Sequence, residues 1–396
     1  MTLLPRIGAP MPLSRLFRRS PETKASKTGP LLALSGPGRP VWTPRDYGAL
    51  AREGYARNPI VYRAIRMVSE AAAGVPIYVR QGQRDLDEHP LLALLDRPSP
   101  GKTRADLIEA MVTHLLIAGN AYVEAVMHDG RVSELHPLRP DRVRVVPGPD
   151  GRAMAHDYRV GSEEVRLWQA TEPVASVLHV ALPNPTHDHY GLAPLEAAQV
   201  SIDVLNAAAA WSKALLDNSA RPSGALIYAP TSGSSLSREQ VERLKAELEE
   251  GFSGAANAGR PLLLEGGLDW KSLSLTPRDM DFAETRATAA REVALAFGVP
   301  PVLLGLKGDT TFRNLEEANR ALWRSTVLPM MARRRAPLDG WLGDAFGGAR
   351  LHVDKDAIEA LAGERAALWK RVGAADFLTA DEKRVAVGYG PKPEAS

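Results

Sequence analysis

The chain has 396 residues, of which 44% are hydrophobic and 24% charged, and its formal net charge is +2. This composition excludes a disordered chain, and the absence of cysteine excludes disulfides, thiolate metal sites, iron–sulfur clusters and cysteine nucleophiles. The near-neutral charge is unlike that of a sequence-specific DNA-binding domain, and no apolar run reaches the ~18 residues that a membrane span requires. At roughly 150 residues per domain, the length predicts two to three domains.

The first forty residues differ in composition from the rest. They carry seven basic residues and one acidic residue, a net charge of +6, which leaves −4 for the remaining 356 residues. They also contain seven prolines and four glycines. A segment of this kind cannot bury enough apolar surface to order itself, so residues 1–40 are predicted to be a disordered basic tail. It is either a solvated leader without a role or a segment that docks onto an acidic partner or DNA.

Residues 41–193 mix helical and strand patterns, which predicts an α+β region. A helix is expected over 59–73, because apolar residues recur there on one face, and a strand over 75–80. Thr103 begins a capping-box pattern for a helix that ends near Gly119. Further strands are expected at 121–127, 132–138, 143–146 and 174–182, continuing one sheet, with a hairpin turn at Asp129-Gly130.

One long helix is predicted over 194–218, about 37 Å long at 1.5 Å per residue. Pro194 suits its first position and Pro222 prevents its continuation. Its polar residues fall on one narrow stripe, and nearly all others are apolar: Glu196, Gln199, Asp203, Asn206, Lys213 and Asp217. We expect this stripe to be the only wet face. The pattern fits both a central helix of a globular core and a helix packed between copies of the chain.

Residues 222–276 have the pattern of a βαββ unit. A strand at 225–228 precedes a helix capped by Ser237 and Gln240, and a hairpin over 261–275 turns at Gly266-Gly267. A second long helix follows over 277–297, with small residues at heptad-like steps: Ala283, Ala287, Ala290 and Ala294. Two long helices therefore bracket a small insert.

A glycine-containing loop over 298–312 comes next, and long loops in compact proteins are usually functional. Val302, Leu303 and Leu304 are expected to pack as its root, against the next helix or a neighbouring copy. That helix, predicted over 313–341, contains Pro329, so a kink is expected near 325–328. Residues 343–396 have helical patterns, at 356–372 and in a short helix capped at Thr379.

The only dense cluster of metal-ligand types is His187-Asp188-His189. Two histidines separated by one residue could chelate a metal on a strand, which leaves a metal-dependent hydrolase as an alternative function. No spacing supplies a third ligand, and a polar turn explains the cluster equally well. Because no catalytic motif is present, we predict no enzymatic activity and no cofactor.

Several stretches of the sequence resemble a known family. Six stretches, taken in order, are similar to the portal proteins of tailed phages, and the length and composition are most similar to portals of alphaproteobacterial gene transfer agents. The stretches are Asn58–Ile65, His89–Pro98, Leu116–Tyr122, Tyr190–Leu195, Phe297–Gly305 and Thr326–Pro329.

The resemblance implies an α+β portal-type subunit with named parts. Residues 41–193 and 313–342 would form the wing, 194–221 and 277–297 the stem, 222–276 the clip, 298–312 the tunnel loop and 343–396 a small crown. The residues expected at the DNA channel are Lys307, Asp309, Thr310 and Thr311. Those expected between subunits are Leu205, Trp211, Ala287 and Ala294, and those expected in the clip are Arg238, Glu242 and Trp270.

The resemblance also implies a function. Portals form rings, here expected to hold twelve copies, at one vertex of a capsid assembled in the bacterial cytoplasm. Double-stranded DNA passes through them non-specifically during packaging and ejection. The implied partners are the major capsid protein, the terminase large subunit and the head–tail adaptor, with no membrane. Another virion structural protein, such as a capsid subunit, is the second alternative.

Overall fold

The computed structural model divides the chain into Met1–Val41 and Trp42–Ser396, and every residue described below lies in the second unit. The structure describes residues 43, 46–169, 173–217, 224–228, 237, 239–240, 242–243, 268–272, 282–306 and 312–390. The predicted tail 1–40, the hairpin arm 261–265, Arg238 and the four predicted DNA-channel residues lie outside these ranges.

Two capped helices, α2 (Pro59–Ala73) and α4 (Arg104–Ala118), pack against each other. Asn58 Oδ1 accepts hydrogen bonds from the N–H groups of Ile60 and Val61 at 3.0 and 3.2 Å, which fixes where α2 begins. Thr103 and Asp106 form a reciprocal capping box, and α4 ends at Gly119 in the left-handed conformation. Both helices confirm the predictions.

The strands predicted as one sheet form two. The first has the order β4 (Arg131–Leu138), β3 (Asn120–His128), β8 (Val177–Ala181), with a tight turn at Asp129-Gly130, where both φ angles are positive. The second has the order β5 (Val143–Pro147), β6 (Ala153–Val160), β7 (Glu163–Trp168). Neither β6 nor β7 is predicted from the sequence; β7 is exposed at nearly every position, so no buried face requires a regular apolar pattern there.

A third sheet includes a strand from residues 343–396. Its order is β11 (Arg350–Val353), β1 (Ile77–Gln81), β2 (Arg84–Leu86), and α3 (Pro90–Asp96) follows β2. The prediction that residues 343–396 are helical is wrong for β11. Instead, β11 pairs antiparallel with β1, from Ile77 opposite Val353 to Arg80 opposite Arg350.

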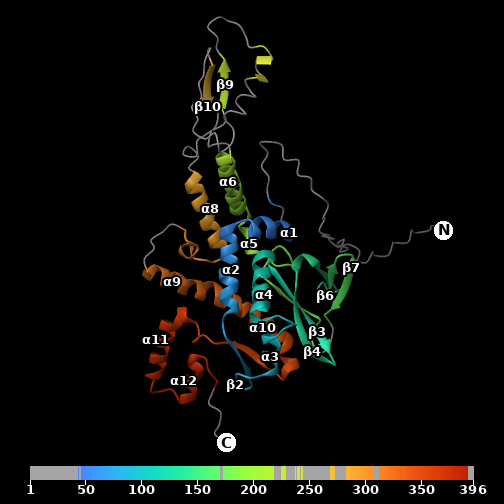
Figure 1. The fold of residues 1–396 in the computed structure, drawn as a ribbon. Coiled ribbons are helices and arrows are strands. Elements are labelled where there is room, and N and C mark those ends of the chain that lie inside the picture. The colour runs from blue at the N-terminus through green and yellow to red at the C-terminus, as the bar shows by residue number, and fades with distance from the viewer. Residues whose placement is uncertain are drawn as a thin grey trace, which may run out of the picture. The chain divides into compact units, whose positions relative to one another are not determined.

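The long helix predicted over 194–218 is interrupted. It consists of α5 (Pro194–Ala197) and α6 (Gln199–Asp217), with a break at Ala198, where ψ is 2°. Helix α8 (Phe282–Ala296) lies beside α6 (Figure 1). Among the described residues between them, β9 (Gly224–Tyr228) pairs antiparallel with β10 (Leu268–Ser272), and Ser237 and Gln240 form the predicted reciprocal cap.

The helix with the predicted kink has a π-helical segment, Trp323–Val327, between α9 (Phe312–Leu322) and α10 (Leu328–Leu342). Pro329 lacks an N–H for the preceding turn, so the irregularity lies where the sequence placed it. Near the C-terminus, α11 (Ala362–Gly373) starts later than predicted, after the 3₁₀ turn Glu359–Leu361, and α12 (Ala380–Val387) is capped by Thr379 as predicted.

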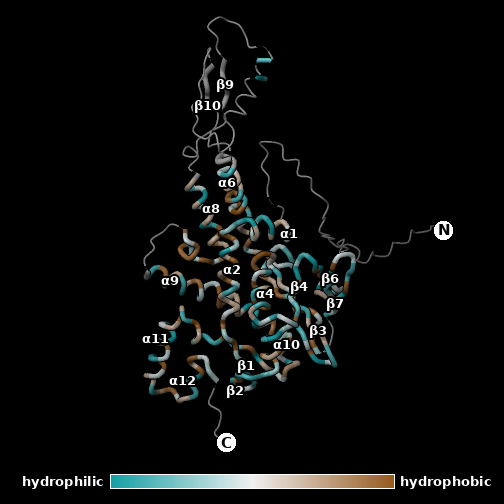
Figure 2. The backbone as a smooth tube through the Cα atoms, viewed as in Figure 1, coloured by the Kyte–Doolittle hydropathy of each residue, from teal (hydrophilic) through white to brown (hydrophobic). Residues whose placement is uncertain are grey.

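The remaining short elements are α1 (Tyr47–Ala49), the π-helical segment Leu50–Ala56 and the 3₁₀ turns Pro140–Arg142, Pro301–Leu304 and Asp344–Phe346. The largest apolar cluster joins α2, α4, α5 and the adjoining ends of α6 and α8 (Figure 2). A second cluster lies between α3, α4, the β3 sheet, β11 and α10.

Candidate functional site

The paired helices α6 and α8 are the part of the chain to which the sequence assigned a role in assembly. At one end they pack into the largest apolar cluster, which we call the main core. There Ile202 and Leu205 of α6 lie with Val293 of α8 and Ile65 of α2. Burial of several such side chains, at roughly 1.5–3 kcal/mol each, holds the pair on α2.

Three residues of the polar stripe, Gln199, Asp203 and Asn206, face the protein, which contradicts the expectation of a wet stripe there, whereas Lys213 is exposed. Gln199 donates its side-chain amide to the carbonyl of Thr43, and Asp203 accepts the N–H of Thr43 at 3.0 Å. Asn206 donates to the carbonyl of Glu53 at 2.7 Å and accepts from Asn58 Nδ2 at 3.1 Å. These polar groups therefore anchor α6 to residues 43–58.

An apolar face of α6 is left open instead. Val200, Val204, Ala207 and Trp211 recur at steps of four, three and four, which places them on one side of the helix, and we call them the open face of α6. Val200 is 59% exposed, Ala207 is exposed, and Val204 and Trp211 are half-buried. The exposed side of a helix is usually polar, so an apolar one is a surface suited to association.

The open face continues onto α8 across a groove of about 320 Å³. Val200 and Val204 line it from α6, and Thr288 and Glu292 line it from α8. Glu292 accepts a hydrogen bond from Ser201 at 2.6 Å across the helix pair. Further along α8, Leu295 is 79% exposed, a large apolar side chain on a surface otherwise made of charged and small residues.

The four residues predicted to lie between subunits have different surroundings. Trp211 belongs to the open face, and Ala287 is half-buried on α8. Leu205 is only 9% exposed and Ala294 is fully buried, so Ala294 offers no surface to a second copy. Of the clip residues, Glu242 is exposed, and Trp270 lies in β10 opposite Leu226 of β9.

Two glycines meet shortly before α5 begins. A Cβ on Gly191 would lie 2.1 Å from the carbonyl oxygen of Gly119, and one on Gly119 would lie 2.4 Å from that of Gly191. The Asn120 Oδ1 accepts the N–H of Gly191 at 2.8 Å, and Gly119 accepts the N–H of Leu182 at 2.8 Å. This junction sets the direction in which the chain enters α5.

A second junction lies where α8 ends. Gly298 has a φ of 64°, and its carbonyl accepts the Thr326 hydroxyl at 2.6 Å, which ties the end of α8 to the π-helical segment. Beyond it, Leu303, Leu304 and Leu306 pack against the main core. Leu303 and Leu304, predicted as the root of the 298–312 loop, thus pack within the same subunit, next to α9.

A buried aromatic and histidine cluster lies between β3, β6 and β8. His179 stacks on Tyr122 at 4.3 Å between ring centroids, and the His156 ring lies 5.6 Å from both. Burial lowers the pKa of His156 to about 4 and, with the charge of His156 as a second cause, that of His179 to about 3. Both histidines are therefore neutral at pH 7.

The predicted metal-ligand cluster is a turn. His187 Nδ1 accepts the N–H groups of His189 and Tyr190 at 3.1 and 3.2 Å, so one of its two ring nitrogens is already used. Within the described part of the chain, no group of three or more His, Asp or Glu side chains is arranged to hold a metal. The same residues include no helix long and apolar enough to cross a membrane.

Asn206, Gly191 and Thr326 were not singled out as site residues from the sequence. Gly191 and Thr326 belong to the family-like stretches, as does Asn58, the partner of Asn206. For Gly191 and Thr326, the position within a family-like stretch is therefore the one indication of a role that the sequence offers. The contacts themselves join residues far apart in the chain, which no local pattern reports.

Comparison with known proteins gives consistent results. The family model described as "Phage portal protein" matches residues 59–388. A chain in the neck of an empty gene transfer agent (GTA) particle is 50% identical, with a TM-score of 0.70 over 91% of this chain and 98% of that chain. The neck of a native GTA particle, computed with C12 symmetry, gives 50% identity and a TM-score of 0.67 over 90% and 97%. A probable portal protein of Streptomyces phage phiC31 is 26% identical over 91% of this chain and 84% of its own length.

Proposed function

This chain belongs to the phage portal protein family, and from that premise we propose that it forms the ring-shaped DNA channel of a phage-like particle of the gene-transfer-agent type. The observation that carries the proposal is the 50% identity to a chain of a GTA neck over nine-tenths of this sequence. The α+β fold and the family predicted from the sequence are confirmed by these comparisons. They do not favour the hydrolase and capsid-subunit alternatives.

We further propose that twelve copies close the ring, because one related neck has been computed with C12 symmetry. A closed ring needs a head-to-tail interface, in which one face of each copy meets a different face of the next. The open face of α6 and Leu295 of α8 supply exposed apolar surface of this kind. In this arrangement α6 and α8 are the stem and residues 222–276 the clip.

The charge distribution supports passage of DNA without tight binding. Each phosphate that a channel neutralises adds affinity, and a ring multiplies the effect. Residues 41–396 have a net charge of −4, and the exposed surface of α8 mixes Glu284 and Glu292 with Arg286 and Arg291. We therefore propose that duplex DNA slides past Lys307, Asp309, Thr310 and Thr311 of the tunnel loop.

The remaining parts of the proposal follow from the family. The particle vertex is the site of action, reached by assembly in the bacterial cytoplasm, and the major capsid protein, the terminase large subunit and the head–tail adaptor are the partners. Residues 41–193 and 313–342 act as the wing, to which β11 adds a strand, and the helices after it act as the crown. The chain acts as a structural conduit without catalysis of its own.

Negative-stain electron microscopy of the purified full-length chain tests the proposal. We expect closed rings with a central channel. Leu295→Glu introduces a charge on the exposed side of α8 and should leave folded single subunits, whereas Leu295→Met, the matched control, should keep the rings. A wild-type chain that stays monomeric at micromolar concentration, with or without other particle proteins, contradicts the ring.

A further inference from the structure

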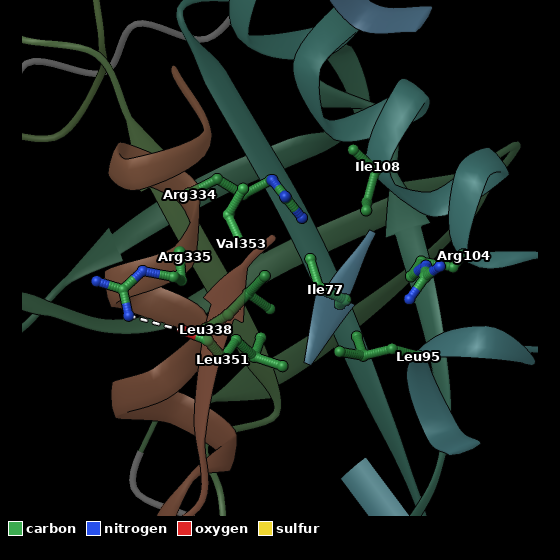
Figure 3. Close-up of a pocket in the computed structure, with 9 residues that line it drawn as sticks. All are labelled: Ile77, Leu95, Arg104, Ile108, Arg334, Arg335, Leu338, Leu351 and Val353. Carbon is green, nitrogen blue, oxygen red and sulfur yellow. Dashed lines mark hydrogen bonds between the residues drawn. The ribbon is translucent and has the colours of Figure 1, made fainter. Parts of the chain in front are cut away.

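A small cavity lies inside the wing, away from the α6–α8 pair. Its volume is about 10 Å³, and it is enclosed by apolar side chains from α3, α4, α10, β1 and β11 (Figure 3). These are Ile77, Leu95, Ile108, Leu338, Leu351 and Val353. This is the space open to the centre of a water-sized sphere, so the cavity holds one small species such as a water molecule or a monatomic ion, which excludes phosphate esters, nucleotides and organic acids.

Three arginines line this apolar cavity, and two of them are neutralised. Arg104 pairs with Asp96 at 3.3 Å, and Arg335 pairs with Asp339 at 3.1 Å and donates to the carbonyl of Leu351 at 2.7 Å (Figure 3). The guanidinium groups of both arginines therefore have a nearby carboxylate.

Arg334 is different. It is only 5% exposed, and its Nε has no hydrogen-bond partner among the described residues. Across the same ranges, no carboxylate lies within ion-pair distance of its guanidinium group. Figure 3 shows the side chain extending from α10 into the space between Val353 and Ile108. Burial, with the charge of Arg104 as a second cause, lowers the pKa of Arg334 to about 10, so the group is still positively charged at pH 7.

A buried charge without a counter-charge is strongly unfavourable, and buried arginines are nearly always paired. A water molecule in the cavity would accept a hydrogen bond but would leave the charge uncompensated. We propose that the cavity binds one small monovalent anion of the halide class, chloride under ordinary conditions, against the guanidinium group of Arg334. The anion completes a charge pair that the described residues leave open.

Thermal unfolding of the full-length assembly tests the site, with chloride, bromide or gluconate as the sodium salt at equal ionic strength. Gluconate is too large for the cavity. Chloride and bromide should raise the apparent Tm by roughly 2–4 °C over gluconate, and the rise should saturate with concentration, as expected for a ligand that binds only the folded state. Equal Tm values in the three salts overturn the proposal.

Two variants separate this site from general salt effects. Arg334→Met keeps the length of the side chain without its charge and should abolish the difference between chloride and gluconate. Arg333→Met removes a neighbouring exposed arginine and should leave that difference unchanged. A halide effect that persists in Arg334→Met assigns it to another site and refutes the proposal.

Anomalous scattering from wild-type crystals grown in bromide decides the matter even if Arg334→Met does not fold. We expect a bromide peak beside the Arg334 guanidinium group at bromide concentrations that saturate the rise in Tm. A cavity that contains only water, or bromide found elsewhere as an adventitious ion only, overturns the proposal.

Discussion

Lowering the pH from 7 to 5 should destabilise the fold around β6 and β8 through two buried histidines. His156 is fully buried, and its Nε2 has no hydrogen-bond partner among the described residues, while its Nδ1 lies 2.9 Å from Gln169 Nε2. His179 stacks on Tyr122, and its Nε2 lies 2.9 Å from Asn120 Oδ1. Burial lowers the pKa to about 4 for His156 and about 3 for His179, so both rings are neutral at pH 7.

The sign and size of the effect follow from proton linkage. In the unfolded chain both histidines titrate near pH 6.5, so the unfolded state binds more protons below that pH, and stability falls from pH 6.5 down to the folded pKa values. At pH 5 this amounts to about 2 kcal/mol for each histidine and about 4 kcal/mol for both. Well above pH 6.5 both histidines are neutral in the folded and in the unfolded state, so they should add no pH dependence to the stability there.

Urea unfolding at a series of pH values, at constant ionic strength and followed by tryptophan fluorescence, measures this loss. His179→Gln cannot titrate in this range and should lose about 2 kcal/mol less than the wild type between pH 7 and 5, as should His156→Gln. The exposed His128 provides the matched control, because His128→Gln should follow the wild type. The reasoning is refuted if the wild-type stability is flat over this range, or if both buried-site variants lose as much as the wild type.

Three further substitutions test the glycine contact, the anchor of α6 and the proposed tunnel loop. Gly191→Ala should destabilise the fold by about 3 kcal/mol or more in urea unfolding, because its Cβ would lie 2.1 Å from the Gly119 carbonyl oxygen, whereas Gly363→Ala in α11, with open space around it, should be neutral or stabilising by about 0.5–1 kcal/mol. Asn206→Ala should cost about 1–3 kcal/mol and increase hydrogen exchange in α6, since the buried Asn58 amide and the carbonyl of the half-buried Glu53 lose their hydrogen bonds; unchanged exchange would argue against the anchor. Lys307→Ala should leave ring assembly intact and change DNA retention in a salt-dependent way, and a block in assembly would remove Lys307 from the channel.

Local signals predicted most helices well. Asn58-Pro59 and the Thr103–Asp106 box fixed the starts of α2 and α4, because a cap is made by neighbours in sequence. Pro329 marked the irregular turn of the α9–α10 helix for the same reason. Strand β11 was missed, because its four residues gain their structure from pairing with β1, which lies far away in the chain.

The polar stripe of α6 shows where pattern reading fails in principle. Periodicity tells which residues share a face of a helix, but not whether water or protein covers that face. Asp203 and Asn206 are half-buried with protein hydrogen-bond partners, while Val200 on the neighbouring face is 59% exposed. The predicted stripe is correct, but protein rather than water surrounds it at Asp203 and Asn206. An exposed apolar face makes sense once the helix is considered as part of a larger assembly.

The resemblance succeeded where single motifs did not, and the contacts explain why. The stretch Leu116–Tyr122 meets Tyr190–Leu195 at the Gly119–Gly191 contact, and Phe297–Gly305 meets Thr326–Pro329 through the bond between Thr326 and Gly298. Asn58 of the first stretch bonds Asn206 of α6. Each stretch is short and unremarkable alone, since glycine, asparagine and proline occur in every turn. Their order along the chain is informative because these pairs must meet to direct α5, α6 and α8, and the two glycine contacts leave no room for a side chain.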